Sequence, residues 1–237
     1  MHSPFVYDLL TKCFYDKTNY LEYEALKAYR LELLQNSEII TVTDFGSGSK
    51  VFKSDKRAIN AIAKTSGTSL KNTKLLFRMV QYFQSASILE LGTNLGIGTY
   101  AMALANTKTE ITTIEGCPAL LKIAEKRLSD NNISHINTIH GEFKVELQKL
   151  TKDKWDLVFF DGNHSKEATL TYFEMLLPNA QNDSVFIFDD IYWSQGMTEA
   201  WEMVKEHPQV TATVDIYNWG IVFFRKEQLK EHFKIRV

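Results

Sequence analysis

Acidic residues and one histidine follow two apolar segments of the chain, and their spacing is suited to acid–base or metal chemistry. Asp161 directly follows one apolar segment, His164 comes three residues later, and Asp189 and Asp190 directly follow a second. Carboxylates at close range raise each other's pKa unless a cation joins them, and oxygen ligands favour Mg²⁺, with Ca²⁺ or Mn²⁺ as alternatives. Asp161, Asp189 and Asp190 are therefore predicted metal ligands. In the competing interpretation, Asp161 caps the next helix and one residue of the Asp pair is a solvated turn residue.

A glycine-rich turn lies upstream of these acids. Gly92, Gly96 and Gly98 let the backbone turn sharply and approach a ligand without a Cβ in the way. Good helix formers follow, so the N-terminal N–H groups of a helix can face ligand atoms. Glu115 ends the next apolar segment, and an acid about 20 residues beyond such a loop can accept hydrogen bonds from both hydroxyls of a ribose. This order of features predicts a nucleotide-shaped pocket.

Two cofactors compete for this pocket, S-adenosylmethionine and a nicotinamide dinucleotide, because a glycine-rich loop alone is a weak signal. The same glycine spacing occurs in short-chain dehydrogenases, which need a Tyr-x-x-x-Lys pair downstream of the loop. The pair with that spacing in this chain, Tyr23 and Lys27, lies far upstream. An NAD(P)-dependent oxidoreductase is thus the alternative, and the missing downstream pair favours the methyl donor.

Alternating strands and helices must position these residues. Because the carboxyl ends of parallel strands lie at one edge of a sheet, where open α/β folds bind ligands, Gly92, Glu115 and the later acids should meet there. The apolar patterns predict strands at 88–91, 111–114, 136–139, 155–160 and 185–188, helices at 100–105, 118–131, 166–177 and 197–206, and a closing hairpin of 211–217 and 221–224 around 218–220.

Two motifs carry a resemblance to a known family. Glu90 completes the pattern Glu-x-Gly-x-x-x-Gly, which resembles the first motif of class I S-adenosylmethionine-dependent methyltransferases. Asp161-Gly-Asn-His164, with Phe188-Asp-Asp-Ile191 after the next strand, resembles the metal-dependent small-molecule O-methyltransferases whose fourth strand ends in Asp-Gly-x-His. The resemblance covers residues 85 to 225. It implies an α/β fold with a Rossmann-like sheet of seven strands, the last one antiparallel, and helices on both faces.

The resemblance also implies residue roles. It assigns the metal to Asp161, Asp189 and Asp190, although catechol-type members carry Asp-Asn at the fifth strand and a lysine base where this chain has His164. An imidazole can accept a proton at neutral pH, so His164 is the predicted base, with Asp161 beside it as a catalytic residue. The predicted cofactor-binding residues are Glu90, Gly92, Thr93, Asn94, Gly96, Gly98, Glu115, Gly116, Glu142 and Asp161, of which Glu142 takes the position where the family often places an acid beside the adenine amino group.

Composition narrows the function classes. A length of 237 residues with 44% hydrophobic residues suits one α/β domain with an added segment. A net charge of -2 gives no electrostatic footprint for nucleic acid or a membrane surface. No apolar run approaches the roughly 20 residues of a membrane span, and no secretory signal is visible, so a cytoplasmic location is expected. The expected reaction transfers a methyl group to a hydroxyl of a small molecule. The alternatives are a methyltransferase acting on protein or nucleic acid and a binding protein without catalysis.

The chain before residue 85 has a different pattern. Residues 1–84 are predicted to form a helical cap, with helices at 19–35, 56–64 and 70–83, and residues 85–237 the methyltransferase domain. We expect the cap to shape the acceptor pocket or a homodimer contact. Val42 to Ser49 also resembles a strand followed by a glycine turn, so Asp44 to Ser49 is predicted to form a turn or lid, or else to contact the ligand directly.

Overall fold

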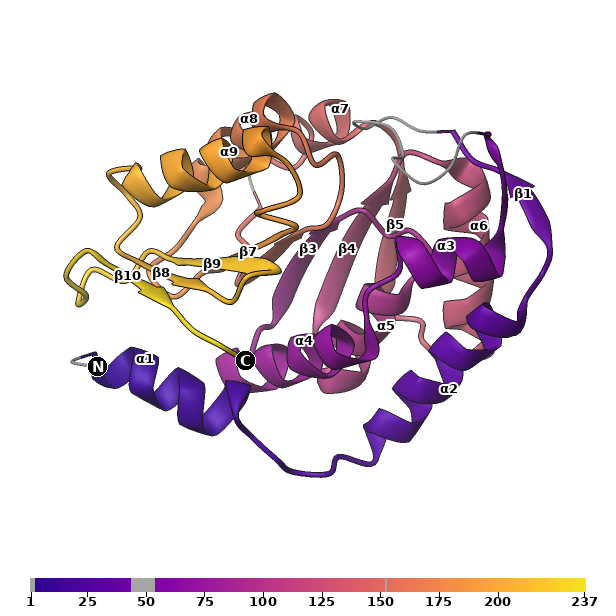
Figure 1. Ribbon diagram of the computed structural model, residues 1–237, viewed down its shortest axis with the longest axis horizontal. Coiled ribbons are helices and arrows are strands. Elements are labelled where there is room, and N and C mark those ends of the chain that lie inside the picture. Colours follow the sequence, from indigo (N-terminus) through magenta and orange to yellow (C-terminus); the bar gives the residue numbers. More distant parts are fainter. Residues whose placement is uncertain (1–2, 44–53, 152) are drawn as a thin grey trace.

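The computed structural model describes residues 3–43, 54–151 and 153–237, which form a central sheet with helices on both faces (Figure 1). The sheet has eight strands within the described residues, in the order β10-β8-β9-β7-β6-β3-β4-β5. In chain order they are β3 (Ser87–Leu91), β4 (Glu110–Glu115), β5 (Ile136–His140), β6 (Leu157–Phe160), β7 (Val185–Asp189), β8 (Ala212–Asp215), β9 (Trp219–Phe223) and β10 (Glu231–Lys234).

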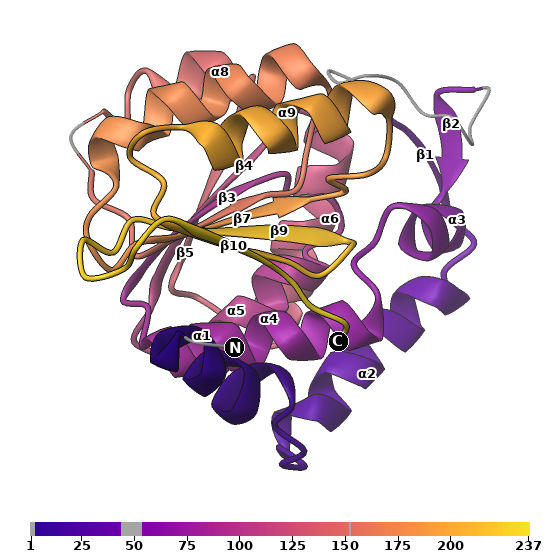
Figure 2. The same cartoon turned by 60° about the vertical axis from the view of Figure 1, so that its left-hand side comes forward.

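The helices form the two outer layers (Figure 2). One layer is built from the first half of the chain: α1 (Pro4–Leu9), the π-helical segment η1 (Leu10–Phe14), α2 (Glu22–Gln35), α3 (Ile59–Thr65), α4 (Leu70–Phe83), α5 (Ile97–Ala105) and α6 (Pro118–Asp130). The other contains α7 (Phe143–Leu147), α8 (Lys166–Leu176) with the short 3-10 segment η2 (Leu177–Asn179), and α9 (Gln195–Glu206).

The core follows from the alternation of side chains along the buried strands. In β6, Leu157 and Phe159 pack with the layer that contains α4 and α5, while Val158 and Phe160 pack with α8 and α9. Successive strand residues point to opposite faces, so a strand covered on both faces is apolar throughout. Burying each such side chain stabilises the fold by roughly 1.5–3 kcal/mol.

Strand register brings the predicted site residues to one edge. Strands β3, β4, β6 and β7 are parallel, and Phe160 pairs with Leu91 on one side and with Phe188 on the other. Asp161 directly follows the end of β6 and therefore lies level with Gly92 and with Asp189. The carboxyl edge of the sheet thus collects residues from three separate segments of the chain.

The predicted fold class is confirmed: seven strands follow the expected order, and β9, the last of them, runs antiparallel to both β7 and β8. Two details differ. An eighth strand, β10, pairs in parallel with β8 at the edge; its mostly exposed, charged residues gave no apolar pattern to detect. The hairpin turn also ends before Trp219, earlier than the predicted turn at 218–220. Gly220 lies inside β9, and its lack of a side chain leaves room for the Trp201 ring, which a Cβ would approach to 2.6 Å.

The N-terminal residues differ from the predicted cap in two places. Residues 56–58 form strand β2 (Lys56–Ala58), which pairs with β1 (Ile39–Thr41), so the helix predicted from 56 begins at Ile59. Helices α4 and α5 pack against each other, so residues on both sides of position 85 share one core. The predicted turn or lid at Asp44 to Ser49 lies outside the described residues. Every helix in the described part of the chain is too short or too polar to cross a bilayer.

Candidate active site

The glycine turn is held tightly against the neighbouring strands. Gly92 has φ +107°, and a Cβ there would lie 2.1 Å from the Asp161 carbonyl oxygen. Its N–H donates to the Ile114 carbonyl (2.9 Å), and the Asp161 N–H donates to the Leu91 carbonyl (2.9 Å). A glycine is required at this position because both the left-handed backbone and the close approach exclude a side chain. The contact joins the turn directly to the strand end that carries Asp161.

The buried side chain of Glu90 stabilises the same turn through hydrogen bonds. Its Oε2 accepts hydrogen bonds from the hydroxyls of Thr99 (2.5 Å) and Thr113 (2.6 Å). Thr93, in the turn, shares a hydrogen bond of 2.6 Å with Thr113. A Cβ on Gly98 would lie 2.9 Å from Glu90 Oε1, so this glycine leaves room for the carboxyl group. Glu90, Thr93 and Gly98 therefore shape the turn together.

Glu90 should make the stability of the protein depend on pH. Burial raises its pKa from 4.5 to about 7, although the two threonine hydroxyls oppose the shift. Between these values the folded protein holds a proton that the unfolded chain releases, so stability is full below pH 4.5 and falls as pH rises through 7. We expect wild type to lose about 1 to 3 kcal/mol more than Glu90→Gln between pH 5 and pH 8 in urea unfolding. Equal losses in the two proteins would contradict this assignment.

Glu115 lies at the tip of β4, on the other side of the turn. Its Oε2 accepts from the backbone N–H of Asn94 (2.9 Å) and its Oε1 from that of Cys117 (2.8 Å). Burial raises the pKa of Glu115, while these N–H donors and the nearby His140 lower it. The carboxylate is held in one orientation, and each oxygen retains a lone pair for a ligand.

An open cleft of about 180 Å³ lies above this edge of the sheet. Of the ten predicted cofactor-binding residues, Gly92, Asn94, Glu115, Gly116, Glu142 and Asp161 line it. Glu90, Thr93 and Gly98 line a much smaller hollow on the far side of the turn, which shares Gly92, Asn94 and Asp161 with the cleft. Gly96 lines neither; it faces Tyr29 of α2. Glu142 is also the N-cap residue of α7, although its side chain makes no capping hydrogen bond.

Sequence reasoning missed several cleft residues. Phe143 and Tyr172 pack edge to face, with ring centroids 5.6 Å apart, and Leu120 adds a further apolar contact. Phe143 directly follows Glu142 in the sequence, and this position could have identified it as a cleft residue. Val42, Thr43 and Arg57 also line the cleft. Val42 and Thr43 belong to the segment whose pattern resembles a strand followed by a glycine turn, whereas nothing in the local pattern of Arg57 indicates this role.

Asp161, which lines the cleft, forms a compact group with His164 and Asp189. Each of the three half-buried side chains offers a ligand atom, and these atoms lie within 4.8 Å of one another. Burial and the neighbouring Asp189 carboxylate raise the pKa of Asp161 well above its ordinary value. Two carboxylates at this distance favour a proton or a cation between them, and an imidazole nitrogen beside them suits either a metal ligand or a base.

Neighbouring residues hold this group in place. Trp219 pairs with Asp189 across β7 and β9, and its indole N–H donates to Asp189 Oδ1 (2.7 Å). Asn163, beside His164, has φ +50° and donates to the Tyr172 hydroxyl (3.1 Å). Asp190, the third predicted ligand, has φ +54° and is not part of the compact group, although its charge acts on the pKa of Asp161. Its role as a ligand stays a prediction.

Comparison with known proteins shows what part of this chain resembles. Residues 89–191 match the model of a methyltransferase domain. That span runs from β3 to the residue after Asp190, so it contains both the glycine turn and the Asp161 group. This part of the chain, somewhat less than half of its length, is thus similar to a methyltransferase domain. No curated protein sequence matches the chain.

Solved structures share the fold of this chain at low identity. The O-methyltransferase TomG from Streptomyces achromogenes, in complex with S-adenosylmethionine, is 20% identical, with a TM-score of 0.61 over 68% of this chain and 82% of TomG. An O-methyltransferase from Bacillus cereus with bound S-adenosylhomocysteine is 18% identical, with a TM-score of 0.61 over 93% of this chain and 96% of its own. Podospora anserina PaMTH1, also bound to S-adenosylhomocysteine, is 15% identical, with a TM-score of 0.62 over 89% of this chain and 99% of its own.

Proposed function

We propose that this protein is a methyltransferase, which transfers the methyl group of S-adenosylmethionine to a hydroxyl of a small molecule with the help of a divalent cation. The observation that carries the proposal is the group of Asp161, His164 and Asp189, which meets the cleft at Asp161. A base next to two carboxylates suits the removal of a proton from a hydroxyl. Such a base is not needed before a methyl group is transferred to an amine that is already neutral, because its nitrogen carries a free lone pair.

The methyl donor would occupy the cleft above the glycine turn. Glu115 would accept hydrogen bonds from the ribose hydroxyls, since each of its oxygens has a lone pair free of the backbone donors. Glu142 would lie beside the adenine amino group, with Phe143 and Leu120 as apolar contacts. The backbone at Gly92 would lie under the methionine part. The S-adenosyl ligands of TomG and of the Bacillus cereus enzyme support this choice of donor.

A divalent cation fits the same edge. Asp161 and Asp189 provide carboxylate oxygens close enough to share one ion, and their mutual repulsion is relieved when it binds. We propose Asp190 as a further ligand because it directly follows Asp189. When bound, the cation would hold the acceptor hydroxyl and lower its pKa. Mg²⁺ suits the carboxylates, and Mn²⁺ becomes the stronger alternative if His164 also binds.

The chain's own residues would then align the acceptor and receive its proton. His164 would accept the hydroxyl proton at a ring nitrogen while the oxygen–methyl bond forms and the sulfur–methyl bond breaks, which leaves S-adenosylhomocysteine. Trp219 would keep Asp189 oriented through its indole N–H. Most of the acceleration would come from holding the oxygen in line with the methyl carbon, because alignment replaces a bimolecular encounter.

Calorimetry with S-adenosylmethionine and with NAD⁺ tests the donor. We expect S-adenosylmethionine to bind and NAD⁺ not to bind; the reverse result would replace the proposal with an oxidoreductase. Glu115→Gln should weaken donor binding by about tenfold or more, the value expected for hydrogen bonds to a charged group. Glu110→Gln is the matched control, because Glu110 is the exposed first residue of the same strand and should leave binding unchanged.

A methylation assay tests the acceptor. Transfer of a labelled methyl group to catechols, sugars and hydroxylated lipids should identify the class that carries the reactive hydroxyl. Methylation confined to protein or nucleic acid would contradict the small-molecule proposal while leaving the donor assignment intact.

A further inference from the structure

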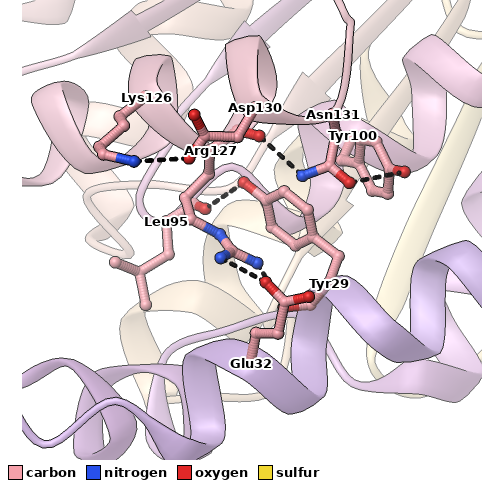
Figure 3. A network of polar contacts seen from close by, with 8 residues as sticks. All are labelled: Tyr29, Glu32, Leu95, Tyr100, Lys126, Arg127, Asp130 and Asn131. Carbon is pink, nitrogen blue, oxygen red and sulfur yellow. Dashed lines mark hydrogen bonds and ion pairs between the residues drawn. The ribbon is translucent and has the colours of Figure 1, made fainter.

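A tyrosine of the N-terminal segment contacts the glycine turn directly (Figure 3). The Tyr29 hydroxyl, on α2, donates a hydrogen bond of 2.9 Å to the Leu95 carbonyl in the middle of the turn. Sixty-six positions separate the two residues in sequence, and Tyr29 is only 2% exposed. A buried tyrosine hydroxyl needs a partner, and a buried carbonyl loses free energy without one. The bond therefore fixes the position of the turn relative to α2.

Gly96 makes this contact possible. It has φ +75°, and a Cβ there would lie 2.8 Å from the Tyr29 hydroxyl oxygen. Any larger residue would push the hydroxyl away from Leu95. The middle glycine of the turn therefore makes room for a protein side chain, whereas Gly92 makes room for the end of β6.

The Tyr29 ring is held in place by two further helices. It stacks on Tyr100 of α5, with ring centroids 4.5 Å apart and 19° between the planes. The Arg127 guanidinium of α6 lies 4.8 Å from the Tyr29 ring centroid, and Arg127 also pairs with Glu32 of α2 at 2.6 Å. Figure 3 shows the Arg127 guanidinium near the Tyr29 ring and paired with Glu32. With the ring fixed by both helices, its hydroxyl has one direction in which to point.

The hydrogen bond between Tyr29 and Leu95 lies next to Asn94, the residue that orients the carboxylate of Glu115. Leu95 follows Asn94, whose N–H donates to Glu115 Oε2 at 2.9 Å and whose side-chain amide donates to the Ser66 carbonyl at 2.8 Å. A turn that shifted at Leu95 would move the Asn94 N–H as well. Tyr29 thus acts on the donor cleft through two adjacent peptide groups, although Tyr29 itself does not line the cleft.

We propose that Tyr29 is a positioning residue for the methyl donor, which holds the turn from Gly92 to Gly98 in its binding conformation through the Leu95 carbonyl. The proposal rests on the proposed function, since it concerns the same donor cleft. A turn that is already ordered binds with a smaller entropic cost. Donor affinity should therefore depend on the Tyr29 hydroxyl, whereas the rate at saturating donor should not.

The test compares Tyr29→Phe with Tyr100→Phe. Both variants remove one hydroxyl from the same stacked pair, but the Tyr100 hydroxyl contacts Asn131 at 3.4 Å, at the end of α6 and away from the turn. In calorimetry with S-adenosylhomocysteine, Tyr29→Phe should raise Kd by about five- to tenfold and Tyr100→Phe by less than about twofold. The kcat of both variants at saturating S-adenosylmethionine should stay within about twofold of wild type.

Hydrogen exchange provides a second readout that a general loss of stability would not reproduce. Amides of residues 93–98 should exchange faster in Tyr29→Phe than in Tyr100→Phe, while the amides of β6 exchange alike. Unchanged donor affinity in Tyr29→Phe, or equal weakening in both variants, would overturn the proposal. If wild type binds neither S-adenosylmethionine nor its product, the proposed function itself fails, which is a different result from equal binding by wild type and Tyr29→Phe.

Discussion

Replacing His164 with alanine should lower kcat for methylation by about 10²- to 10⁴-fold, the range expected for loss of a general base. The Kd for S-adenosylmethionine should change by less than about threefold, because His164 does not line the donor cleft. Its ring lies beside the carboxylates of Asp161 and Asp189, where the acceptor hydroxyl would be held. Single-turnover kinetics and calorimetry measure the two quantities separately.

His232→Ala is the matched control for this variant. His232 is exposed on β10, at the far edge of the sheet, where its Nδ1 lies 2.8 Å from the Thr213 hydroxyl. Activity should be unchanged in this control. Equal losses of rate and donor affinity in His164→Ala would refute the assignment of His164 as the base, because a base acts on the transfer step alone.

Asp189→Asn should weaken cation binding by at least about 100-fold, since even outer-shell partners of a metal contribute 10- to 100-fold. The asparagine oxygen can still accept the hydrogen bond from Trp219, so the fold should be retained. Titration with Mn²⁺, followed by electron paramagnetic resonance, measures the affinity. Methylation should disappear after dialysis against a chelator and return on addition of Mg²⁺ or Mn²⁺.

Two further variants identify the third ligand. The Asp-Asp sequence predicts Asp190, whereas the compact group contains His164 instead. Weaker Mn²⁺ binding in Asp190→Asn would support the ligand set predicted from the sequence. Unchanged binding in that variant, with weaker binding in His164→Gln, would assign the third position to the imidazole. Full activity after exhaustive chelation would contradict metal assistance altogether.

Local patterns were sufficient to predict most of the fold. Fully buried strands such as β6 and β7 are apolar throughout, and the glycine turn with Glu115 indicated a strand, a loop, a helix and a second strand. Parallel order then placed Asp161 and Asp189 at one edge, which their register confirms. β10 and the exact hairpin turn were missed because an exposed charged strand and a buried glycine have no distinctive local pattern.

By itself, the sequence determined which strand ends carry acids, where the backbone must turn without a side chain, and hence the class of the fold. Only the tertiary structure decided what supports those groups: Trp219 beside Asp189, Phe143 and Tyr172 around the cleft, and Tyr29 on the glycine turn. The physical reason is the difference in sequence separation over which these interactions act. Strand alternation and backbone sterics act over a few neighbouring residues, whereas a hydrogen bond between residues 29 and 95 forms only after separate helices have packed on the same sheet.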